Sequence, residues 1–319
     1  MLQIIVDRLL YSVLGLDASS ALARSLNFFI YDSVKILLLL FGMIFLIGFL
    51  RTYIPQDKIK DWLGARKYGS GNVAASLFGA ITPFCSCSSI PIFLGFLEAG
   101  VPIGAAFSFL ITSPLVNEYL AVLMLGYFGW KITAAYVLSG IILGAICGMV
   151  LGRMNLEKHL AKDLITSHSK ASKSIKYNGI NGRLAFGLKE SVSIVKKVGL
   201  WVIVGVGIGA LIHNYVPSEF IQGMIDKGGV FTVPIVTLLG IPMYGSCAAI
   251  VPIAMVLFQK GVPLGTALAF MMATSALSMP EAVMLRRAMN LKLIMIFFGI
   301  TALGIIFTGY LFNMLQYML

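Results

Sequence analysis

Charged side chains are scarce in this chain. Only 12% of the 319 residues are charged, whereas 59% are hydrophobic. A soluble domain usually carries about 25% charged and about 45–50% apolar residues. The apolar residues also form long uncharged runs, at 36–50, 132–151 and 198–212. With their flanks, these runs approach the roughly 20 residues that cross a bilayer as a helix. The composition argues against a soluble domain and predicts an all-α polytopic membrane protein.

Two sequence signals are also missing. No Gly-x-x-x-x-Gly-Lys-Ser/Thr phosphate loop occurs, so we expect no ATP site in this chain and no enzyme activity. Residues 1–25 lack a compact apolar core that ends in an Ala-x-Ala-like site, so no removable signal peptide is predicted. We expect residues 1–28 to form an amphipathic segment on the membrane surface. The alternative is that these residues cross the membrane.

Cysteine and histidine are few. The four cysteines, at positions 85, 87, 147 and 247, all lie in apolar segments, which argues against the disulfide framework of a secreted domain. There is no Cys-x-x-Cys pair, and no histidine lies near a cysteine in the sequence. We therefore expect neither a metal centre nor a cofactor.

The net charge of +11 is placed between the apolar segments. Residues 153–192 are rich in Lys and Arg, and the positive-inside rule predicts that this linker is cytoplasmic. That placement argues against nucleic acid as a partner and for an inner-membrane protein surrounded by lipid. A small-molecule substrate is expected, and a homo-oligomer is left open.

The chain repeats itself at a spacing of 161–162 residues. Tyr53-Ile54-Pro55 recurs as Tyr215-Val216-Pro217, and the segment 100–104 recurs at 261–265. We therefore divide the chain into a first membrane repeat, 29–152, the linker 153–192, and a second membrane repeat, 193–319.

Charge predicts that the two repeats are inverted. Loop 51–69 carries five basic residues, whereas its counterpart 213–229 carries only Lys227. The next pair of loops has the opposite bias, because 126–131 has one lysine while its counterpart contains Arg286, Arg287 and Lys292. Inverted repeats are typical of secondary transporters with a binding site at the membrane midplane.

Inversion requires an odd number of crossings in each repeat, yet each repeat has four apolar segments. In each repeat, one apolar segment is therefore predicted to enter the membrane and return without crossing it. These segments are 71–98, which contains Pro83 and Pro91, and 229–258, which contains Pro242 and Pro252. Proline interrupts helical hydrogen bonding, and interrupted backbone is tolerated at membrane depth only inside protein or beside a polar cavity. We expect two re-entrant or broken helices. Eight full transmembrane helices in parallel repeats are the alternative.

A stripe of small residues predicts close helix packing in the first repeat. Gly140, Gly144, Gly148 and Gly152 lie four residues apart and share one helix face. Cys147 beside them is interpreted as a packing residue.

Thiols and hydroxyls are concentrated in the segment Thr82–Pro91. It contains Cys85, Ser86, Cys87 and Ser88, and the second repeat places Ser246 and Cys247 at the corresponding position. Polar groups at membrane depth tend to mark a substrate path, and thiols favour thiophilic species. A Cys pair matches the two exchangeable positions of a trivalent arsenic centre that bears one organic group. The alternative is that these small residues only permit a tight helix crossing.

Two acidic residues lie in or beside apolar segments. Glu118 follows Asn117, and Glu281 follows Met279-Pro280. A carboxyl at membrane depth is costly and often carries protons, so we expect Glu118 and Glu281 to be candidates for proton coupling, with Asn117 as a polar partner near the substrate. A structural hydrogen bond for Glu118, or an ion pair between Glu281 and Arg286, is the alternative.

These motifs resemble the predicted-permease family that includes the ArsP organoarsenical exporters. The resemblance rests on the segment 82–91, on Gly-Val-Pro-x-Gly and on Ser-Pro-x-x-Asn, and it extends over the whole chain. It implies a permease in which Cys85 and Cys87 bind a trivalent arsenical. A permease for an unrelated small solute or anion, and a membrane subunit that relays electrons through thiols, are the alternative interpretations.

The inverted arrangement predicts a labelling pattern. Single cysteines introduced into 55–69 and 217–228 should react with membrane-impermeant reagents from opposite sides of the membrane. Labelling from the same side would support the parallel arrangement of eight full crossings.

Overall fold

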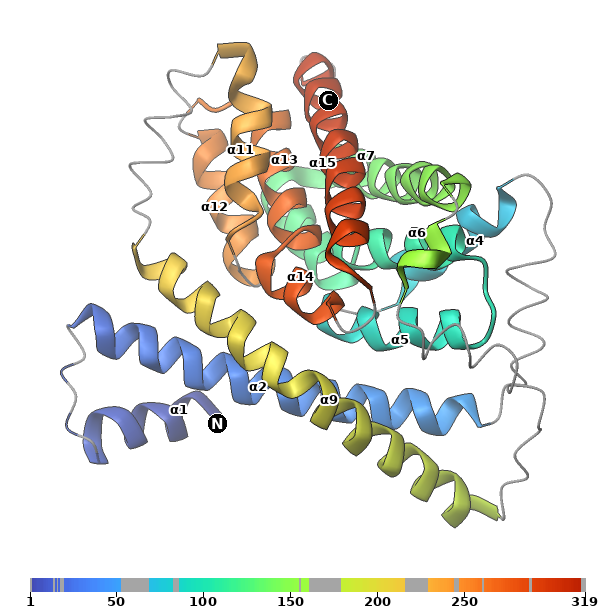
Figure 1. Cartoon of the computed structure of the whole chain (residues 1–319). Coiled ribbons are helices and arrows are strands. Elements are labelled where there is room, and N and C mark those ends of the chain that lie inside the picture. The colour runs from blue at the N-terminus through green and yellow to red at the C-terminus, as the bar shows by residue number, and fades with distance from the viewer. Residues whose placement is uncertain are drawn as a thin grey trace.

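The computed structural model describes residues 2–13, 15, 17, 20–52, 69–82, 86–154, 156–160, 179–215, 229–243, 247–259, 261–286 and 289–316. Helices form nearly all regular structure in this part of the chain, together with one isolated bridge between Leu160 and Met289 (Figure 1). Three of the described helical stretches are long and apolar enough to cross a membrane, namely Leu120–Arg153, Leu264–Leu285 and Leu291–Leu315. The expected all-α polytopic membrane protein is confirmed at this level.

The helices differ greatly in length. In the first part of the chain they are α1 (Leu2–Asp7) with a π-helical turn (Arg8–Val13), α2 (Ala21–Arg51), α4 (Ser70–Ile81), α5 (Ser86–Glu98), α6 (Ile103–Leu115), α7 (Glu118–Arg153) and a 3-10 turn (Leu156–His159). In the second part they are α9 (Gly179–Tyr215), a 3-10 turn (Gly229–Phe231), α11 (Thr232–Gly240), α12 (Cys247–Gln259), α13 (Leu264–Ala276), α14 (Met279–Leu285) and α15 (Leu291–Leu315).

Two of the expected segment boundaries fall inside helices. The boundary after residue 28 lies within α2, and the boundary after residue 192 lies within α9. Hydropathy marks the residue at which a helix becomes apolar, whereas the helix itself begins earlier, in amphipathic turns.

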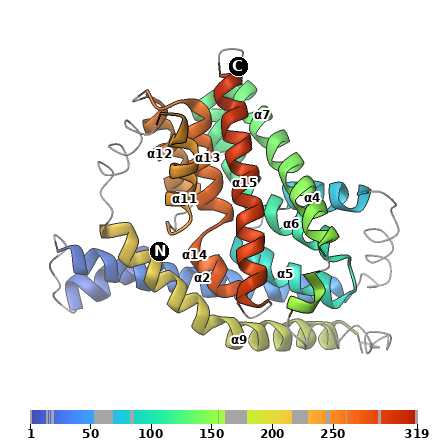
Figure 2. The same ribbon diagram turned by 45° about the horizontal axis from the view of Figure 1, so that its top comes forward.

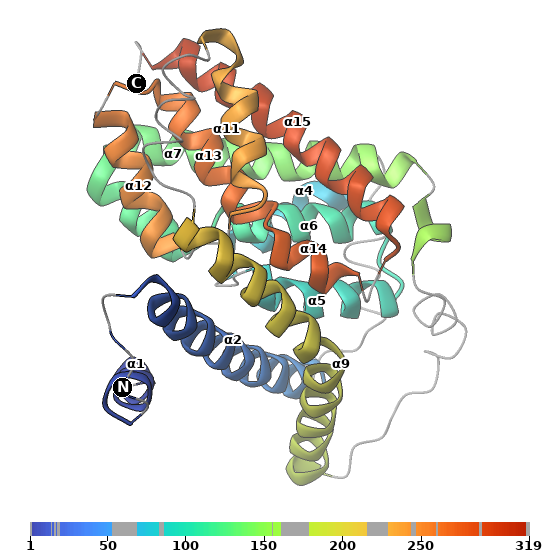
Figure 3. The same ribbon diagram turned by 60° about the vertical axis from the view of Figure 1, so that its left-hand side comes forward.

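The long helices α2 and α9 pack against each other in antiparallel directions. Near one end, the Arg183 guanidinium donates a 2.8 Å hydrogen bond to the carbonyl oxygen of Thr52. Near the other end, Gly207 lies against the ring of Phe29. The short α1 is joined to α2 by hydrogen bonds among Gln3, Asp7 and Asn27. Together α1, α2 and α9 form a layer on one side of the remaining helices (Figures 1 and 3).

The second layer has the short helices at its centre. Every residue of α6 and of α13 is buried. Helix α6 packs against α4, α5 and α7, and α13 packs against α11, α12 and α15. Figure 2 shows α11, α12, α13 and α15 side by side, with α4, α6 and α7 beyond α15. The two layers meet where α2 contacts α5 and α9 contacts α14.

Helices α7 and α15 are also antiparallel. The Cys147 thiol lies 3.8 Å from the carbonyl oxygen of Ile300, and Gly304 packs against Leu143. Beyond the end of α7, the backbone N–H of Asn290 donates to the carbonyl oxygen of His159 at 3.0 Å. The residues after α7 therefore lie beside the residues before α15.

Glycine allows α6 and α7 to approach closely. A Cβ atom on Gly140, Gly144, Gly148 or Gly152 would meet, in that order, Val116, Thr112, Ser108 or Gly104 of α6 or its C-terminal cap. The contacts recur every four residues on both helices, so they follow one face along the whole length of α6. The small-residue face expected from the sequence is confirmed, and Cys147 beside it is buried.

This packing predicts that a single methyl group at Gly148 destabilises the protein. The added Cβ of Gly148→Ala would lie 2.6 Å from the Gly104 carbonyl oxygen and 2.7 Å from the Ser108 nitrogen, so backbone must move. We expect a loss of about 1–3 kcal/mol of stability, the usual cost of overpacking, seen as a lower thermal unfolding midpoint in detergent.

The matched control is Gly299→Ala, because a Cβ there has no neighbouring atom within 4 Å. Its midpoint should be unchanged or slightly raised, since alanine favours helix. Equal destabilisation by both substitutions would contradict the close approach of α6 and α7.

Candidate functional site

Four interruptions of the helical backbone define the candidate site. Two of them separate α4 from α5 and α11 from α12. The other two are short: Val116 and Asn117 separate α6 from α7, and Leu277 and Ser278 separate α13 from α14. A break leaves backbone N–H and C=O groups without helical partners, which makes it a natural place for a ligand at membrane depth.

The prolines expected at the breaks lie in different kinds of position. Pro242 lies in the turn that follows α11, and Pro83 lies outside the described residues. Helices α5 and α12, in contrast, continue through Pro91 and Pro252. Both prolines are the sixth residue of their helix, where each removes only one helical hydrogen bond. The breaks lie before Pro91 and Pro252, not at them.

The sequence motif rich in thiols lies at the first break. Ser86, Cys87 and Ser88 form the first turn of α5, and Cys247 is the first residue of α12. Cys85 and Ser246, the other two members of the expected substrate site, lie outside the described residues. The convergence of the thiols on one ligand therefore stays a prediction.

The ends of the three short helices α4, α5 and α6 contact one another. The hydroxyls of Ser89 on α5 and Ser113 on α6 form a 2.8 Å hydrogen bond, and both residues are fully buried. Gly79, near the end of α4, has so little space that a Cβ would lie 3.2 Å from the Ser113 nitrogen. The break between α4 and α5 therefore lies beside the break between α6 and α7.

The short helices α11, α13 and α14 make similar contacts. A Cβ on Gly240, at the end of α11, would lie 2.9 Å from the Cβ of Ala273 on α13. The backbone N–H of Met279, the first residue of α14, donates to the carbonyl oxygen of Ile241 at 3.0 Å. The break after α11 is thus joined directly to the break between α13 and α14.

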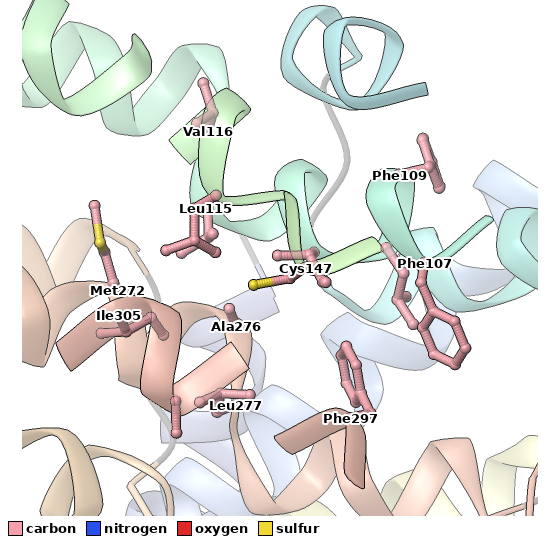
Figure 4. Close-up of a cluster of buried hydrophobic side chains, with 14 of the residues drawn as sticks. Phe107, Phe109, Leu115, Val116, Cys147, Met272, Ala276, Leu277, Phe297 and Ile305 are labelled. Carbon is pink, nitrogen blue, oxygen red and sulfur yellow. The ribbon is translucent and has the colours of Figure 1, made fainter. Parts of the chain in front are cut away.

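The breaks of the two repeats also approach each other. Helix α6 contacts α13, α7 contacts α12, and α5 contacts α14. Figure 4 shows Leu115 and Val116 from one short break and Ala276 and Leu277 from the other, in one buried cluster around Cys147. The described ends of all four breaks therefore lie in one region of the protein.

The two polar residues at the start of α7 are placed differently. Asn117 is buried, and its side-chain oxygen accepts a 2.7 Å hydrogen bond from the backbone N–H of Leu120. It therefore caps α7, which satisfies one of the free N–H groups at the helix start. Glu118, the next residue, is exposed.

Glu281 lies in α14 and is completely buried. Neither of its carboxyl oxygens has a hydrogen-bond partner among the described residues. Arg286 at the end of α14 is exposed, and the structure gives no ion pair between it and Glu281. The alternative in which Arg286 neutralises this carboxyl is therefore wrong for the described side chains.

Three buried hydroxyls at the breaks were not chosen as site residues from the sequence: Ser89, Ser113 and Ser275. The Ser275 hydroxyl has no hydrogen-bond partner in the described part of the chain. Their sequence signal was available, because Ser113 and Thr274, the neighbour of Ser275, are 161 residues apart in otherwise apolar segments. What the sequence did not reveal is that these segments end beside the thiol motif. Among the described residues, no three His, Cys, Asp or Glu side chains cluster as metal ligands.

The fold and the site define a multi-pass membrane protein with broken helices. A family model described as "Predicted permease" (ArsP_1) matches residues 21–314, so the chain belongs to this family of predicted permeases, which are transporters and not enzymes. No solved structure matches the chain.

Curated relatives agree with this assignment. A Streptococcus mutans protein is 25% identical over 270 residues, which cover 81% of this chain and 85% of that protein; it is named as a candidate subunit of a two-component membrane permease complex. A Methanocaldococcus jannaschii protein named only as a UPF0718 protein is 21% identical, over 88% of this chain and 92% of its own length. A UPF0718 protein of Bacillus subtilis is 27% identical over 54% of this chain and 60% of its own length.

The cap formed by Asn117 generates a prediction. Asn117→Ala should destabilise the protein by about 1 kcal/mol, the usual cost of a lost N-cap, whereas Asn117→Asp should keep most of the stability. Asn290→Ala is the matched control, because Asn290 caps α15 in the same way, at 3.0 Å from the Leu293 nitrogen, outside the region of the breaks. Thermal unfolding should show a comparable loss for both alanine variants. A stable Asn117→Ala variant would contradict the capping role.

Proposed function

We propose that this protein is a secondary permease that exports a small thiophilic solute, such as a trivalent organoarsenical, and that transport is coupled to protons. The observation that carries the proposal is that the described ends of four helix breaks lie close together, and that two of these breaks lead into helices that begin with the thiol motifs. Membership of the family of predicted permeases supports transport in general. The thiols and the family resemblance support the choice of substrate.

We further propose that the permease consists of two inverted repeats. The helix bounds support a repeat: α5 and α12 both have 13 residues, as do α6 and α13, and the members of each pair begin 161 residues apart, at positions 86 and 247 and at 103 and 264. Gly129, where α7 is kinked, likewise corresponds to Asn290, where α15 begins.

The direction of the corresponding helices supports inversion. Helices α2 and α9 are antiparallel, and so are α7 and α15. Parallel repeats would place both pairs in the same direction across the membrane. We therefore prefer the inverted arrangement to eight full crossings in parallel repeats.

The charge pattern supports one cytoplasmic face. The end of α2, which leads into the basic loop 51–69, lies beside Arg183 of the basic linker. The start of the linker lies beside the basic turn before α15, through the backbone contact of His159 with Asn290. Basic segments thus adjoin each of these two pairs of helix ends, which supports their assignment to the cytoplasmic side of an inner membrane by the positive-inside rule.

The second candidate function is a permease for a small polar solute that is not thiophilic. The observation that favours it is the set of buried hydroxyls at the breaks, Ser89, Ser113 and Ser275. Hydroxyls bind many hydrogen-bonding solutes and have no preference for soft metals or metalloids.

Cysteine substitutions distinguish the two candidates. Vesicles that contain Cys85→Ser or Cys87→Ser should lose flux of a trivalent organoarsenical, because one thiol of the pair is missing. Cys147→Ala is the matched control: this thiol is buried between α7 and α15, so flux should be preserved. Undiminished arsenical flux in both serine variants would remove the thiol site and leave the hydroxyl-lined permease as the better proposal.

A further inference from the structure

Glu281 occupies a position that the first repeat fills with leucine. Helix α7 begins at Glu118 after its N-cap Asn117, and α14 begins at Met279 after its N-cap Ser278. Counted from these caps, the third helical residue is Leu120 in the first repeat and Glu281 in the second, 161 residues later. Leu120 is 1% exposed and Glu281 is 0% exposed. This position is therefore buried in both halves of the chain. It holds the apolar Leu120 in the first half and the carboxyl of Glu281 in the second.

Nothing in the described part of the chain satisfies this carboxyl. The backbone N–H of Ser278 faces it, but neither oxygen completes a hydrogen bond. The Ser275 hydroxyl in the last turn of α13 also lacks a partner and is buried. A buried, unpaired carboxylate is very costly, and such a group becomes stable when it takes up a proton. Two unsatisfied polar residues on either side of the α13–α14 break are thus a reason to look for a ligand there.

The charged groups near Glu281 belong to the helices that pack against α14. Helices α5, α9 and α13 surround α14 directly or through its preceding break, and α13 contains no titratable residue. The titratable and charged residues of α5 and α9 are Cys87 and Glu98, and Arg183, Lys189, Glu190, Lys196, Lys197, His213 and Tyr215. Of these, Lys189 and Lys196 are exposed, and Arg183 binds Thr52. Neither oxygen of the Glu281 carboxyl has a hydrogen-bond partner among the described side chains.

We infer that Glu281 is the site, among the carboxyls of the described residues, at which the coupling proton binds, with a single proton taken up and released in each transport cycle. The inference rests on the proposed function and selects Glu281 over Glu118, which is exposed. The step is the simple equilibrium in which the carboxylate binds a proton from water on one side and returns it on the other. Only one proton is carried because Leu120 at the corresponding position cannot bind one. A metal cation would require several further oxygen ligands, and the described surroundings are mainly apolar.

The helix break explains how protonation is linked to transport. Glu281 lies two residues after Met279, whose N–H bonds Ile241 at the end of α11. The break after α11 leads into α12, which begins at Cys247. A change in the charge of Glu281 therefore acts at the junction that positions the second thiol-bearing helix.

Infrared difference spectroscopy of the purified protein tests proton binding without any substrate. As pH is varied, the wild type should show one carboxylic-acid C=O band that disappears on deprotonation and that is absent in Glu281→Gln. Glu118→Gln is the matched control and should retain the band. Absence of the band in the wild type, or its persistence in Glu281→Gln, would overturn the inference whatever the substrate proves to be.

Glu281→Leu separates a proton site from a structural carboxyl. Because the first repeat already holds leucine at this position, the variant should unfold at the same or a higher temperature than the wild type. In vesicles loaded with a trivalent organoarsenical, it should lose flux driven by a pH gradient while retaining exchange of labelled for unlabelled arsenical. A large loss of thermal stability, a retained response to the pH gradient, or a requirement for Na⁺ would overturn the inference. No arsenical transport by the wild type would instead count against the proposed substrate, and the infrared result would still decide the proton site.

Discussion

The fold depends on the need to satisfy interrupted backbone away from water. Within a membrane, a non-helical segment is tolerated only where protein covers it. Here the cover comes from α6 and α13, which are buried along their entire length. Glycine at positions such as 144 and 148 lets α7 approach α6 closely enough to seal one side of the breaks. Close helix packing and broken helices therefore belong together, because close packing lowers the energetic cost of interrupted backbone in the membrane.

The breaks in the first part and in the second part of the chain satisfy their polar groups differently. In the first, Asn117 caps α7, and the hydroxyls of Ser89 and Ser113 bond to each other. In the second, Ser278 provides no side-chain cap, and the groups of Ser275 and Glu281 have no described partners. The Thr112 hydroxyl in the last turn of α6 is also buried without a described partner, so the difference between the two breaks lies in the helix cap and in the carboxyl of Glu281. We propose that the break between α6 and α7 has a structural role, whereas the break between α13 and α14 binds the proton.

The sequence predicted the features that depend on periodicity and composition. The helical class, the glycine face of α7 and the interrupted segments near residues 82 and 242 follow from apolar runs, four-residue spacing and proline. It misjudged features that depend on where a residue lies within a helix. Pro91 and Pro252 are near enough to helix starts that the helices continue, and of the two candidate carboxyls Glu281 is buried whereas Glu118 is exposed. The bond between Ser89 and Ser113 joins residues from separate helices, and no local pattern specifies such a contact.

The described ends of four helix breaks lie in one region of the protein. The most direct measurement is an electron-microscopy density map of the protein in lipid nanodiscs, traced through residues 82–86, 116–117, 241–246 and 277–278. The account predicts non-helical backbone at all four places, adjacent to one another near the middle of the membrane. Continuous helices through these residues, or breaks that lie on opposite sides of the membrane, would contradict it.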